Sequence, residues 1–447
     1  MGTIDLERET MTDESKLEET LETKLDKIAK RSRQDPKMEF SYLMMLFNKR
    51  NLMSCFHELD GKKAVGIDRR TKEDYGRDLE SNVEGLIARM KTMSYRAQPV
   101  REVLIPKASG GSRPLGISCI EDKIIQMMFA KILGAIYEPL FRETSFGFRP
   151  GRNCHQALKA VGQYTYENHC KVVIDLDLEN YFGSIEHTKL VALIRIKIKD
   201  ERFVRYLVRM LKSGILSEGE LLRTAEGTPQ GSIVSPILAN IFGHYAMDKW
   251  FEDSVRKHIR GNAGMFRYCD DCVICVNDRE DANNILIAME GRLKRFGLRM
   301  NAKKTRVVPF DKWKARKGMK QGVFTFLGFE LYIGRSRKGG VLTKYKTEGK
   351  RFRRKLKEVN AWCRRSRSFS KLQNFWKVFC KKLQGHINYY AISHNGRVVE
   401  RFVDRAVKIF FKWINRRSQR RCMSWEQFQK FLRVFPPPKV TIKFRMF

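Results

Sequence analysis

Apolar residues recur along much of the chain with the spacing of amphipathic helices. In the stretch 121–137, for example, Ile124, Ile125, Met128 and Ile132 share one face, which predicts a helix. The same spacing predicts helices at 38–58, 74–93, 153–166, 187–196, 202–213, 235–250 and 281–296, and from about 347 to the proline run at 436–438. The prolines end the last helix because they cannot continue its hydrogen bonds.

Short apolar runs that favour strands lie between these helices. Val172–Leu176 is a continuous run with three β-branched residues and predicts a buried strand. Val100–Pro106 and Arg113–Ile117 flank a Gly-Gly turn and predict a hairpin, and 265–276 and 324–333 each predict a strand pair. The pattern therefore predicts an α+β fold whose C-terminal part is helical.

Positive charge is concentrated in that C-terminal part. The 447 residues carry a formal net charge of +38, and 29 Lys and Arg stand against five Asp and Glu in 341–447. A hydrophobic content of 42% is too high for a disordered polycation, so a folded protein with an anionic partner is expected. Nucleic acid is the first candidate and an acidic membrane the second. The best apolar stretch, 124–136, is shorter than the ~20 residues of a membrane span and contains Lys131.

Three further features limit the interpretation. Aromatic residues alternate with the basic ones after 341; they could stack bases, but their helical spacing favours a core. The first 36 residues, ten of them acidic and seven basic, predict a polar, partly helical extension without a signal peptide. The ten cysteines show no disulfide framework, which is typical of reduced thiols in a cytosolic protein.

Aspartates lie in or next to two of the predicted strands. Asp175 and Asp177 end the segment VVIDLD, and Asp270 and Asp271 are adjacent in FRYCDDCVIC. Adjacent carboxylates in apolar surroundings resist ionisation unless a cation neutralises them, and Mg²⁺ prefers such oxygen ligands. Two ions ~4 Å apart would clamp the attacking and leaving oxygens of a phosphoryl transfer. The alternatives are an ordinary β-turn at Asp-Asp and strand-end caps at the first pair.

Three cysteines surround the adjacent aspartates. Cys269, Cys272 and Cys275 form a C-x2-C-x2-C run, a spacing that suggests zinc. No second CxxC or His pair lies nearby to complete four ligands. We therefore expect these cysteines to act as small apolar residues of a hairpin.

Several motifs accompany the carboxylates. Residues 268–271 read YCDD, and GTPQG at 227–231 is followed by SPILAN at 235–240. Further motifs are IPK at 105–107 with GSRPLGI at 111–117, FGFRPGR at 146–152, FLGF at 326–329 and GHINYY at 385–390. Together they resemble the motifs of the group II intron-encoded reverse transcriptase/maturase family, over roughly residues 50–447.

The resemblance implies a right-hand polymerase with fingers and palm, followed by an all-helical thumb or maturase (X) domain. The expected division is a polar N-terminal extension at 1–36, an N-terminal extension with fingers at 37–170, a palm with the carboxylates at 171–339 and the basic thumb/maturase domain at 340–447. The resemblance is to the bacterial type that lacks an HNH endonuclease domain. A cytoplasmic protein, nucleoid-associated when acting on DNA, is expected.

The resemblance also implies roles at the reacting centre. Two Mg²⁺ ions would be held by Asp177, Leu178, Asp270 and Asp271. Asp175 would lie next to these ligands without binding the metal itself. Lys304, or Lys303 next to it, would protonate the pyrophosphate leaving group. Phe182 would be the steric gate that rejects a 2′-hydroxyl; the alternative is an ordinary core residue.

The remaining implied contacts go to the dNTP and to nucleic-acid phosphate. They come from two cations of the fingers hairpin, two residues near the nucleotide sugar and two loop arginines: Lys107, Arg113, Gln230, Gly231, Arg149 and Arg152. For the cations and arginines, an exposed surface position is the alternative.

The implied function is an RNA-directed DNA polymerase that also acts as a maturase in group II intron splicing and mobility. Its partners would be an RNA template, intron RNA, a DNA or RNA primer and the RNA–DNA duplex, while the oligomeric state stays open. Two alternatives remain: an RNA-binding splicing cofactor with little polymerase activity, and a domesticated reverse transcriptase in phage defence or DNA repair. The chain departs from the family pattern at Gly183, where Asp is frequent, at His386, where Trp is usual, and in the loop 61–69.

Overall fold

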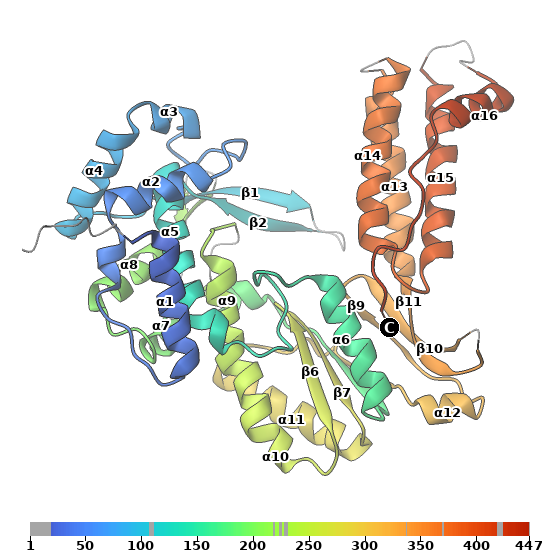
Figure 1. Cartoon of the computed structure of the whole chain (residues 1–447), viewed down its shortest axis with the longest axis horizontal. Helices are drawn as coiled ribbons and strands as arrows, with labels where there is room; N and C mark the ends of the chain where they lie inside the picture. Colours follow the sequence, from blue (N-terminus) through green and yellow to red (C-terminus); the bar gives the residue numbers. More distant parts are fainter. Residues whose placement is uncertain are drawn as a thin grey trace, which may run out of the picture. The chain divides into compact units, whose positions relative to one another are not determined.

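The computed structural model describes residues 19–106, 111–217, 220–222, 226–227, 231–336, 338–368, 371–417 and 423–446 (Figure 1). The chain forms two compact units, each assembled from two separate stretches. Unit 1 contains Met1–Phe141 and Ile185–Phe242, and unit 2 contains Arg142–Ser184 and Gly243–Phe447. The predicted domain limits remain predictions.

Unit 1 is mainly helical and is built around one buried helix. Its helices are α1 Leu21–Gln34, η1 Leu43–Leu46, α2 Lys49–Glu58, α3 Lys72–Arg77, α4 Leu79–Lys91, α5 Ile120–Tyr137, α7 His187–Arg195, α8 Glu201–Leu211 and α9 Ser235–Gly243. Helix α5 is apolar nearly all round, and α1 and α2 pack against it. A helix of that composition must be covered on most sides, which makes α5 the centre of this core.

The predicted fingers hairpin is present in unit 1. β1 Val100–Pro106 and β2 Ser112–Ile117 pair antiparallel, with Leu104 opposite Pro114. β4 Ile215–Ser217 adds to β1 in parallel, and β5 Glu220–Leu222 completes the order β2-β1-β4-β5. The last two strands were not predicted.

Unit 2 contains a four-stranded antiparallel sheet that carries the carboxylates. Its order is β6 Ala263–Tyr268, β7 Asp271–Val276, β3 Val172–Leu176 and β8 Arg306–Pro309. Helix α6 Cys154–Glu167 packs against β6 and β7, and α11 Arg279–Arg295 packs against β3 and β7. The predicted central strand is therefore confirmed, with its side chains buried except for the half-buried Asp175.

A second sheet leads into the C-terminal helices. β9 Val323–Phe326 and β10 Phe329–Arg335 form the predicted strand pair, and β11 Val341–Thr347 pairs with β10. β11 was not predicted, and it begins just inside the segment expected to be wholly helical. The helices are α12 Lys312–Arg316 before this sheet, and α13 Gly349–Ser366, α14 Leu372–Tyr390, α15 Gly396–Ile414 and α16 Trp425–Val434 after it.

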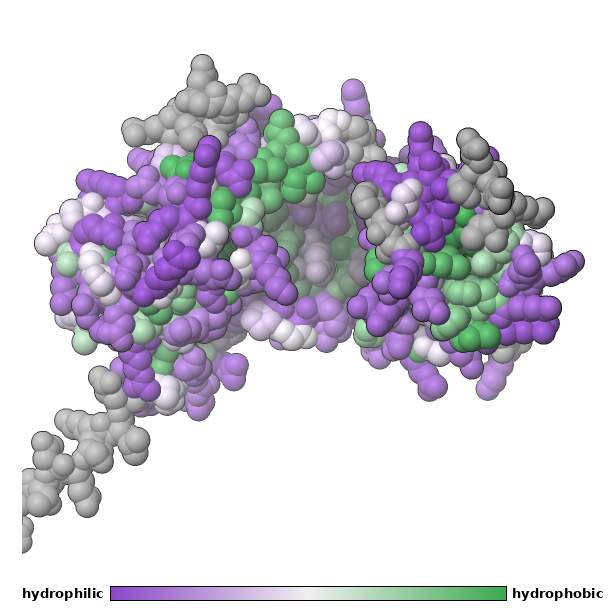
Figure 2. Space-filling model, turned by 90° about the horizontal axis from the view of Figure 1, so that it is seen from above, coloured by the Kyte–Doolittle hydropathy of each residue, from purple (hydrophilic) through white to green (hydrophobic). Residues whose placement is uncertain are grey.

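One apolar core runs through unit 2. It joins residues of the carboxylate sheet, such as Val173, to Phe329 of the second sheet and to Phe379 and Phe410 of the C-terminal helices. The aromatic residues after 341 thus mainly form a core, as their spacing predicts. Their burial leaves the basic residues outside, and hydrophilic residues dominate the face of the molecule seen in Figure 2.

Two predicted helices are interrupted. In the stretch 38–58, Tyr42 has a left-handed backbone (φ 59°), and a regular α-helix begins only at Lys49. In the stretch 235–250, α9 ends at Gly243 and π-helical turns follow at His244–Asp248 and Phe251–Val255. Such π-turns are frequent near functional sites. Among the described residues, no helix has the length and apolar character needed to cross a membrane.

Candidate active site

The strand register brings the predicted carboxylates to one end of the sheet. Asp175 is opposite Val273 and Leu176 is opposite Cys272 in the β3–β7 pair. One residue further along, the same register places Asp177 opposite Asp271. Tyr268 pairs with Asp271 in the β6–β7 hairpin, so Cys269 and Asp270 form a two-residue turn. Asp177, Asp270 and Asp271 therefore meet where β3 ends and the hairpin turns.

The turn itself has an unusual backbone. Cys269 has φ 61°, in the region that a side chain disfavours, and Asp270 does not. A positive φ at the first turn residue alone is the pattern of a type II′ hairpin turn, in which glycine is preferred. Cys269 is buried in this conformation. A strained residue held by its surroundings is a common feature of active sites.

A glycine of the FGFRPGR motif packs directly on this turn. A Cβ atom on Gly147 would lie 2.5 Å from the Cys269 nitrogen and 2.9 Å from the Tyr268 carbonyl carbon. The preceding segment runs beside β6, because the Phe146 N–H donates to the Arg267 carbonyl (2.9 Å) and the Arg267 N–H donates to that of Thr144 (3.0 Å). The motif thus supports the turn through its backbone.

A buried ion pair, which was not predicted from the sequence, also supports the turn. The Arg267 guanidinium bonds both carboxylate oxygens of Asp248, with Nε–Oδ1 2.7 Å and Nη2–Oδ2 2.5 Å. The same guanidinium donates to the Ser145 hydroxyl (2.9 Å) and to the Cys269 carbonyl (3.1 Å). A charged residue inside an apolar strand was the available signal, since buried arginines are nearly always paired.

Asp175 and Asp177 differ in their partners. Asp175 accepts from Arg306 on β8 (Nη2–Oδ2 2.8 Å); burial raises the pKa of this carboxyl, and Arg306 opposes that rise. Asp177 lies within 3.3 Å of Lys304 Nζ, and its backbone is held by the Asn301 N–H (2.8 Å to the carbonyl) and the Thr305 hydroxyl. Lys304, rather than Lys303, is the lysine that reaches the carboxylates.

Asp271 lies among other carboxylates, and Arg351 is the cation that acts against them. The residue is exposed at the start of β7. Desolvation of its carboxyl and then the charge of Asp270 raise the pKa of Asp271 to about 7; Asp177 and Asp175 add to the rise, and Arg351 opposes it. A carboxylate in that position is stabilised by any cation that binds beside it.

The donor set fits magnesium. Asp177, Asp270 and Asp271 offer hard oxygen ligands at one end of the sheet, and the raised pKa of Asp271 shows charge that a divalent cation would neutralise. Leu178 could contribute only its backbone carbonyl, because its side chain is a hydrocarbon, and that side chain is buried. Over the described ranges, no three His, Cys, Asp or Glu side chains already converge into a metal cage.

Phe182 lies on a short 3₁₀ turn, Tyr181–Ser184, that follows β3. Its ring is half-buried and meets Tyr181 edge-on, with centroids 5.8 Å apart. The amide of Asn180 occupies the space beside Gly183, since a Cβ there would lie 2.2 Å from Asn180 Nδ2. An aspartate at position 183, which is frequent in the family, would require the Asn180 side chain to move.

The two loop arginines bond to the protein itself. Arg149 is buried, and its Nη1 donates to the carbonyls of Arg142 (2.7 Å) and Ser145 (2.8 Å). Arg152 donates to the carbonyl of Glu143 (2.7 Å) and pairs with the carboxylate of that residue. Both arginines order the loop next to the turn, and their phosphate contacts remain predictions.

The predicted nucleotide-binding residues of unit 1 are described only in part. Gly231 has φ 107°, and a Cβ there would lie 2.6 Å from the Gly116 carbonyl, so its loop closely approaches β2. Arg113 is on β2 opposite Ile105, and its side chain lies outside the described part. Lys107 and Gln230 also lie outside the described residues.

The three hairpin cysteines are free thiols packed in the sheet. All are buried, and burial raises the pKa of Cys269, Cys272 and Cys275 above its usual range. Zinc binds the thiolate, which this environment disfavours. Their surroundings support the interpretation as small apolar residues.

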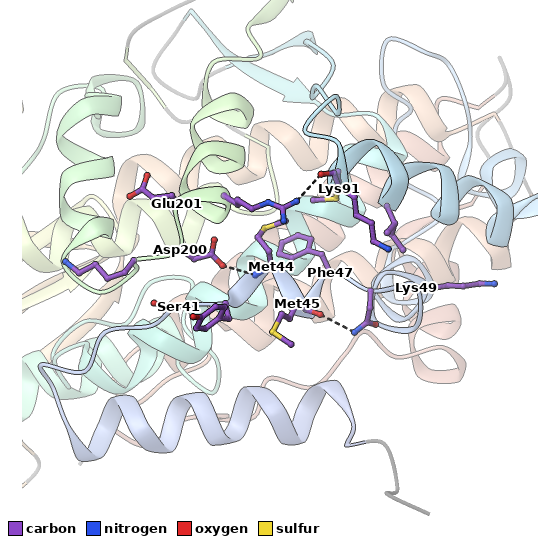
Figure 3. Close-up of a pocket in the computed structure, with 14 residues that line it drawn as sticks. Ser41, Met44, Met45, Phe47, Lys49, Lys91, Asp200 and Glu201 are labelled. Atoms are coloured by element: carbon purple, nitrogen blue, oxygen red, sulfur yellow. Dashed lines mark hydrogen bonds between the residues drawn. The ribbon is translucent and has the colours of Figure 1, made fainter.

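A pocket of about 850 Å³ lies elsewhere, in unit 1 (Figure 3). Its lining includes Met44, Met45 and Phe47, and the Met44 N–H donates to the Asp200 carboxylate (3.1 Å). Lys49 at its edge pairs with Glu80 and Glu84. None of the predicted site residues lines this pocket.

Residues 105–331 match the sequence model of the family described as "Reverse transcriptase (RNA-dependent DNA polymerase)". The chain belongs to the reverse transcriptase family. The matched span includes every residue predicted above for the site, from Lys107 to Lys304.

Relatives of this reverse transcriptase include intron-encoded proteins. It is 40% identical over 172 residues to the group II intron-encoded protein LtrA of Lactococcus lactis, which covers 38% of this chain and 28% of LtrA. It is 31% identical over 315 residues to the protein YkfC of Escherichia coli, covering 62% and 78%. It is 39% identical over 236 residues to an uncharacterized 91 kDa protein in the cob intron of Schizosaccharomyces pombe, covering 52% and 28%. The matches to LtrA and the 91 kDa protein thus span less than a third of those relatives.

Proposed function

We propose that the protein is an RNA-directed DNA polymerase that copies an RNA template with dNTPs. The observation that supports this proposal is the pairing of Leu176 with Cys272, which brings Asp177 and Asp271 to the same end of the sheet, with Asp270 in the adjoining turn. Membership of the reverse transcriptase family supports the reaction type. The carboxylates of these three residues and the carbonyl of Leu178 would hold the metal.

The chemistry is the attack of the primer 3′-hydroxyl on the dNTP α-phosphate, with pyrophosphate leaving. Two Mg²⁺ ions, when bound, would stabilise negative charge on the attacking and leaving oxygens. Lys304 Nζ, already 3.3 Å from Asp177, would give a proton to the leaving pyrophosphate. Arg306 holds Asp175 in an ion pair, which keeps that carboxylate out of the reacting set.

Phe182 would select deoxynucleotides. It follows β3 by a few residues and is only half-buried, so its ring can form part of the wall of the nucleotide site. A bulky ring beneath the sugar would clash with a 2′-hydroxyl. Within unit 1, Gly231 packs closely on β2, and the absence of a side chain there would let the loop backbone approach a nucleotide.

The C-terminal helices would bind nucleic acid. The aromatic residues of α13–α16 fill the core. The segment 341–447 contains 29 Lys and Arg but only five Asp and Glu. We infer that this surface holds the template–primer duplex, and also an intron RNA in the manner of a maturase. The similarity to LtrA, a group II intron-encoded protein, and to the 91 kDa protein of the cob intron supports the second role.

Primer extension on an RNA template tests the proposal. Wild type should add dNTPs with Mg²⁺, and Asp270→Asn/Asp271→Asn should lose extension while keeping its fold and its RNA affinity. Phe182→Val should gain ribonucleotide addition without losing dNTP addition, which separates a gate from a core residue. Folded wild-type protein that binds RNA but never extends a primer would instead favour the splicing cofactor.

A further inference from the structure

An aromatic and basic patch lies on unit 2 away from the carboxylates. It consists of Tyr166 and His169 at the end of α6 and of Lys312, Trp313 and Arg316 on α12, and we call it the α12 patch. The sequence analysis did not identify it. Neither the carboxylate chemistry nor the basic C-terminal helices use these residues.

The rings of the patch are ordered but remain open to solvent. Trp313 stacks on His169, with centroids 6.1 Å apart and planes 24° apart, and its Nε1–H donates to His169 Nδ1 (3.3 Å). Lys312 Nζ lies 4.6 Å from the Tyr166 centroid, and Arg316 lies 5.7 Å from that of Trp313. Trp313 is still 48% exposed and Tyr166 51% exposed. Exposed rings with flanking cations are the usual elements of a single-strand binding surface.

The cations around the rings are not paired with any carboxylate that the structure describes. The segment 312–320 contains Lys312, Lys314, Arg316, Lys317 and Lys320 and no Asp or Glu. Within the described residues, none of these five cations forms an ion pair with a carboxylate. Asp311, directly before this segment, caps α12 by accepting from the Trp313 N–H (2.8 Å). This contrasts with Lys49 and Arg306, whose charges are paired.

A hollow of about 260 Å³ adjoins the patch, lined by Met319, Lys320, Tyr332 and Arg335 among others. It lies where α12 meets β10 and β11. A nucleotide flanking the stacked one would find both an aromatic ring and a cation there. The patch and the hollow therefore offer room for more than one unpaired nucleotide.

The position of the patch separates it from the reaction. In the β3–β8 pair, Val172 is opposite Pro309 and Asp175 is opposite Arg306, so α12 follows the end of β8 that is remote from the carboxylates. Val172 and Asp177 are five residues apart, or about 16 Å along an extended strand. Figure 1 shows α12 beside β10 and β11, away from helices α13–α16.

We propose that the α12 patch binds unpaired nucleotides of a nucleic-acid strand, with bases on Trp313 and Tyr166 and phosphates against Lys312 and Arg316. RNA is the occupant we favour, because the family copies RNA. The patch would hold a strand outside the catalytic site, such as template not yet copied or a loop of a folded RNA. This binding does not require the polymerase reaction.

Equilibrium binding by full-length protein tests the proposal. The protein is first loaded with an RNA–DNA template–primer that ends in a dideoxynucleotide, and a labelled oligouridylate that cannot pair with it is then titrated. The variant Lys312→Ala/Trp313→Ala/Arg316→Ala should bind the oligomer about ten-fold more weakly, from loss of stacking and of two phosphate contacts. Its slope of log K against log salt should become shallower by about 1.4, because each single-strand phosphate contributes about 0.7.

A matched control removes one exposed ring and two exposed cations from unit 1. Arg31→Ala/Arg33→Ala/Tyr42→Ala should leave the affinity within two-fold of wild type and the salt slope unchanged. Equal losses in the two variants, or no loss in either, would overturn the proposal. An RNA duplex tests whether the patch requires unpaired nucleotides. Weaker binding of the duplex than of the oligouridylate supports the proposal, and tighter binding of the duplex contradicts it.

A second measurement does not depend on the variants folding. Wild-type protein is photocrosslinked to an RNA that contains 4-thiouridine, and the modified peptides are identified. Crosslinks at Tyr166 or Trp313 are expected, and crosslinks elsewhere only would refute the site. Primer extension by the α12 variant should match wild type on a short template, so loss of patch binding stays distinct from failure of the proposed polymerase.

Discussion

Arg267 and Asp248 form an ion pair in the core of unit 2, with side chains 1% and 3% exposed. The pair joins a π-helical turn after α9 to the strand that enters the YCDD hairpin. Because the guanidinium also donates to the Cys269 carbonyl, it fixes the turn that presents Asp270. Asp248, 19 positions before Arg267, thus helps through that arginine to set the position of Asp270.

Asp248→Asn should destabilise the protein strongly, and a paired apolar replacement should not. Removing one partner leaves a buried guanidinium without its countercharge, for which about 3–5 kcal/mol of unfolding free energy is typical. Asp248→Leu/Arg267→Met removes both charges and should recover most of that loss, as measured by urea unfolding. Its primer-extension kcat should still fall about ten-fold, because a buried carbonyl has lost its donor. A folded double variant with the wild-type kcat would show that the pair supports only the fold.

Gly147→Ala should impair polymerisation more than its size suggests. The added methyl would lie 2.5 Å from the backbone nitrogen of Cys269, which is a backbone atom and cannot turn away as a flexible side chain can. Either the loop or the catalytic turn must shift, and a displacement of about 1 Å can lower the rate of catalysis about 100-fold. Single-turnover nucleotide addition measures the effect.

Gly291→Ala is the matched control for that substitution. Gly291 lies inside α11 of the same unit, and nothing stands within 4 Å of an added Cβ. Alanine is favoured over glycine in a helix interior by about 1 kcal/mol, so this variant should be as active as wild type and slightly more stable. Similar activity losses in both variants would mean that Gly147 has no special relation to the turn.

Local sequence patterns predict much of the fold. β1, β3 and the β6–β7 hairpin were predicted because alternating or continuous apolar runs and a tight polar turn are short-range signals. β11 was missed although Thr343, Tyr345 and Thr347 are buried at every second position. The two lysines between these residues make the segment similar in composition to the basic helices that follow. Its strand conformation depends on pairing with β10.

The motifs in the sequence predict which residues form the candidate site, but they do not predict the contacts between those residues. The motif pattern identified the carboxylates, but nothing in the order of Lys303 and Lys304 tells which lysine reaches Asp177. The fold decides that through the turn at 301–305, held by hydrogen bonds to the end of β3. Likewise the role of Arg149 within its loop depends on carbonyls that only folding brings together.

Lys304→Ala should therefore slow nucleotide addition, and Lys303→Ala should not. Lys304 is largely exposed yet lies within 3.3 Å of Asp177, so its removal should leave the fold intact. Loss of a general acid lowers a rate by about 100-fold or more. Pre-steady-state incorporation of one dNTP by the two variants provides the comparison, with KM for dNTP expected to change little. Equal rates for the two variants would exclude the assignment of Lys304.

Acidification should destabilise unit 2 through His386. This imidazole stacks on Phe402 with centroids 3.6 Å apart and lies next to Tyr390, and among the described residues no partner bonds its buried Nε2. Burial, and then the charge of Lys355, lowers the pKa of His386 to about 4. Because the folded state resists protonation more than the unfolded state does, stability is complete above the unfolded pKa of about 6.5 and is lost as the pH falls toward 4.

His386→Phe tests this dependence, since it keeps a ring against Phe402 and removes the titrating group. Between pH 7.5 and 5.5 the histidine should lower the unfolding free energy of wild type by about 1 kcal/mol, or about 2–4 °C in Tm. Other groups also titrate in this range, so the relevant quantity is the difference between the two proteins at each pH. That difference should shift in favour of the phenylalanine variant at pH 5.5. A difference that is the same at both values would mean that the pKa of His386 is the same in the folded and the unfolded protein.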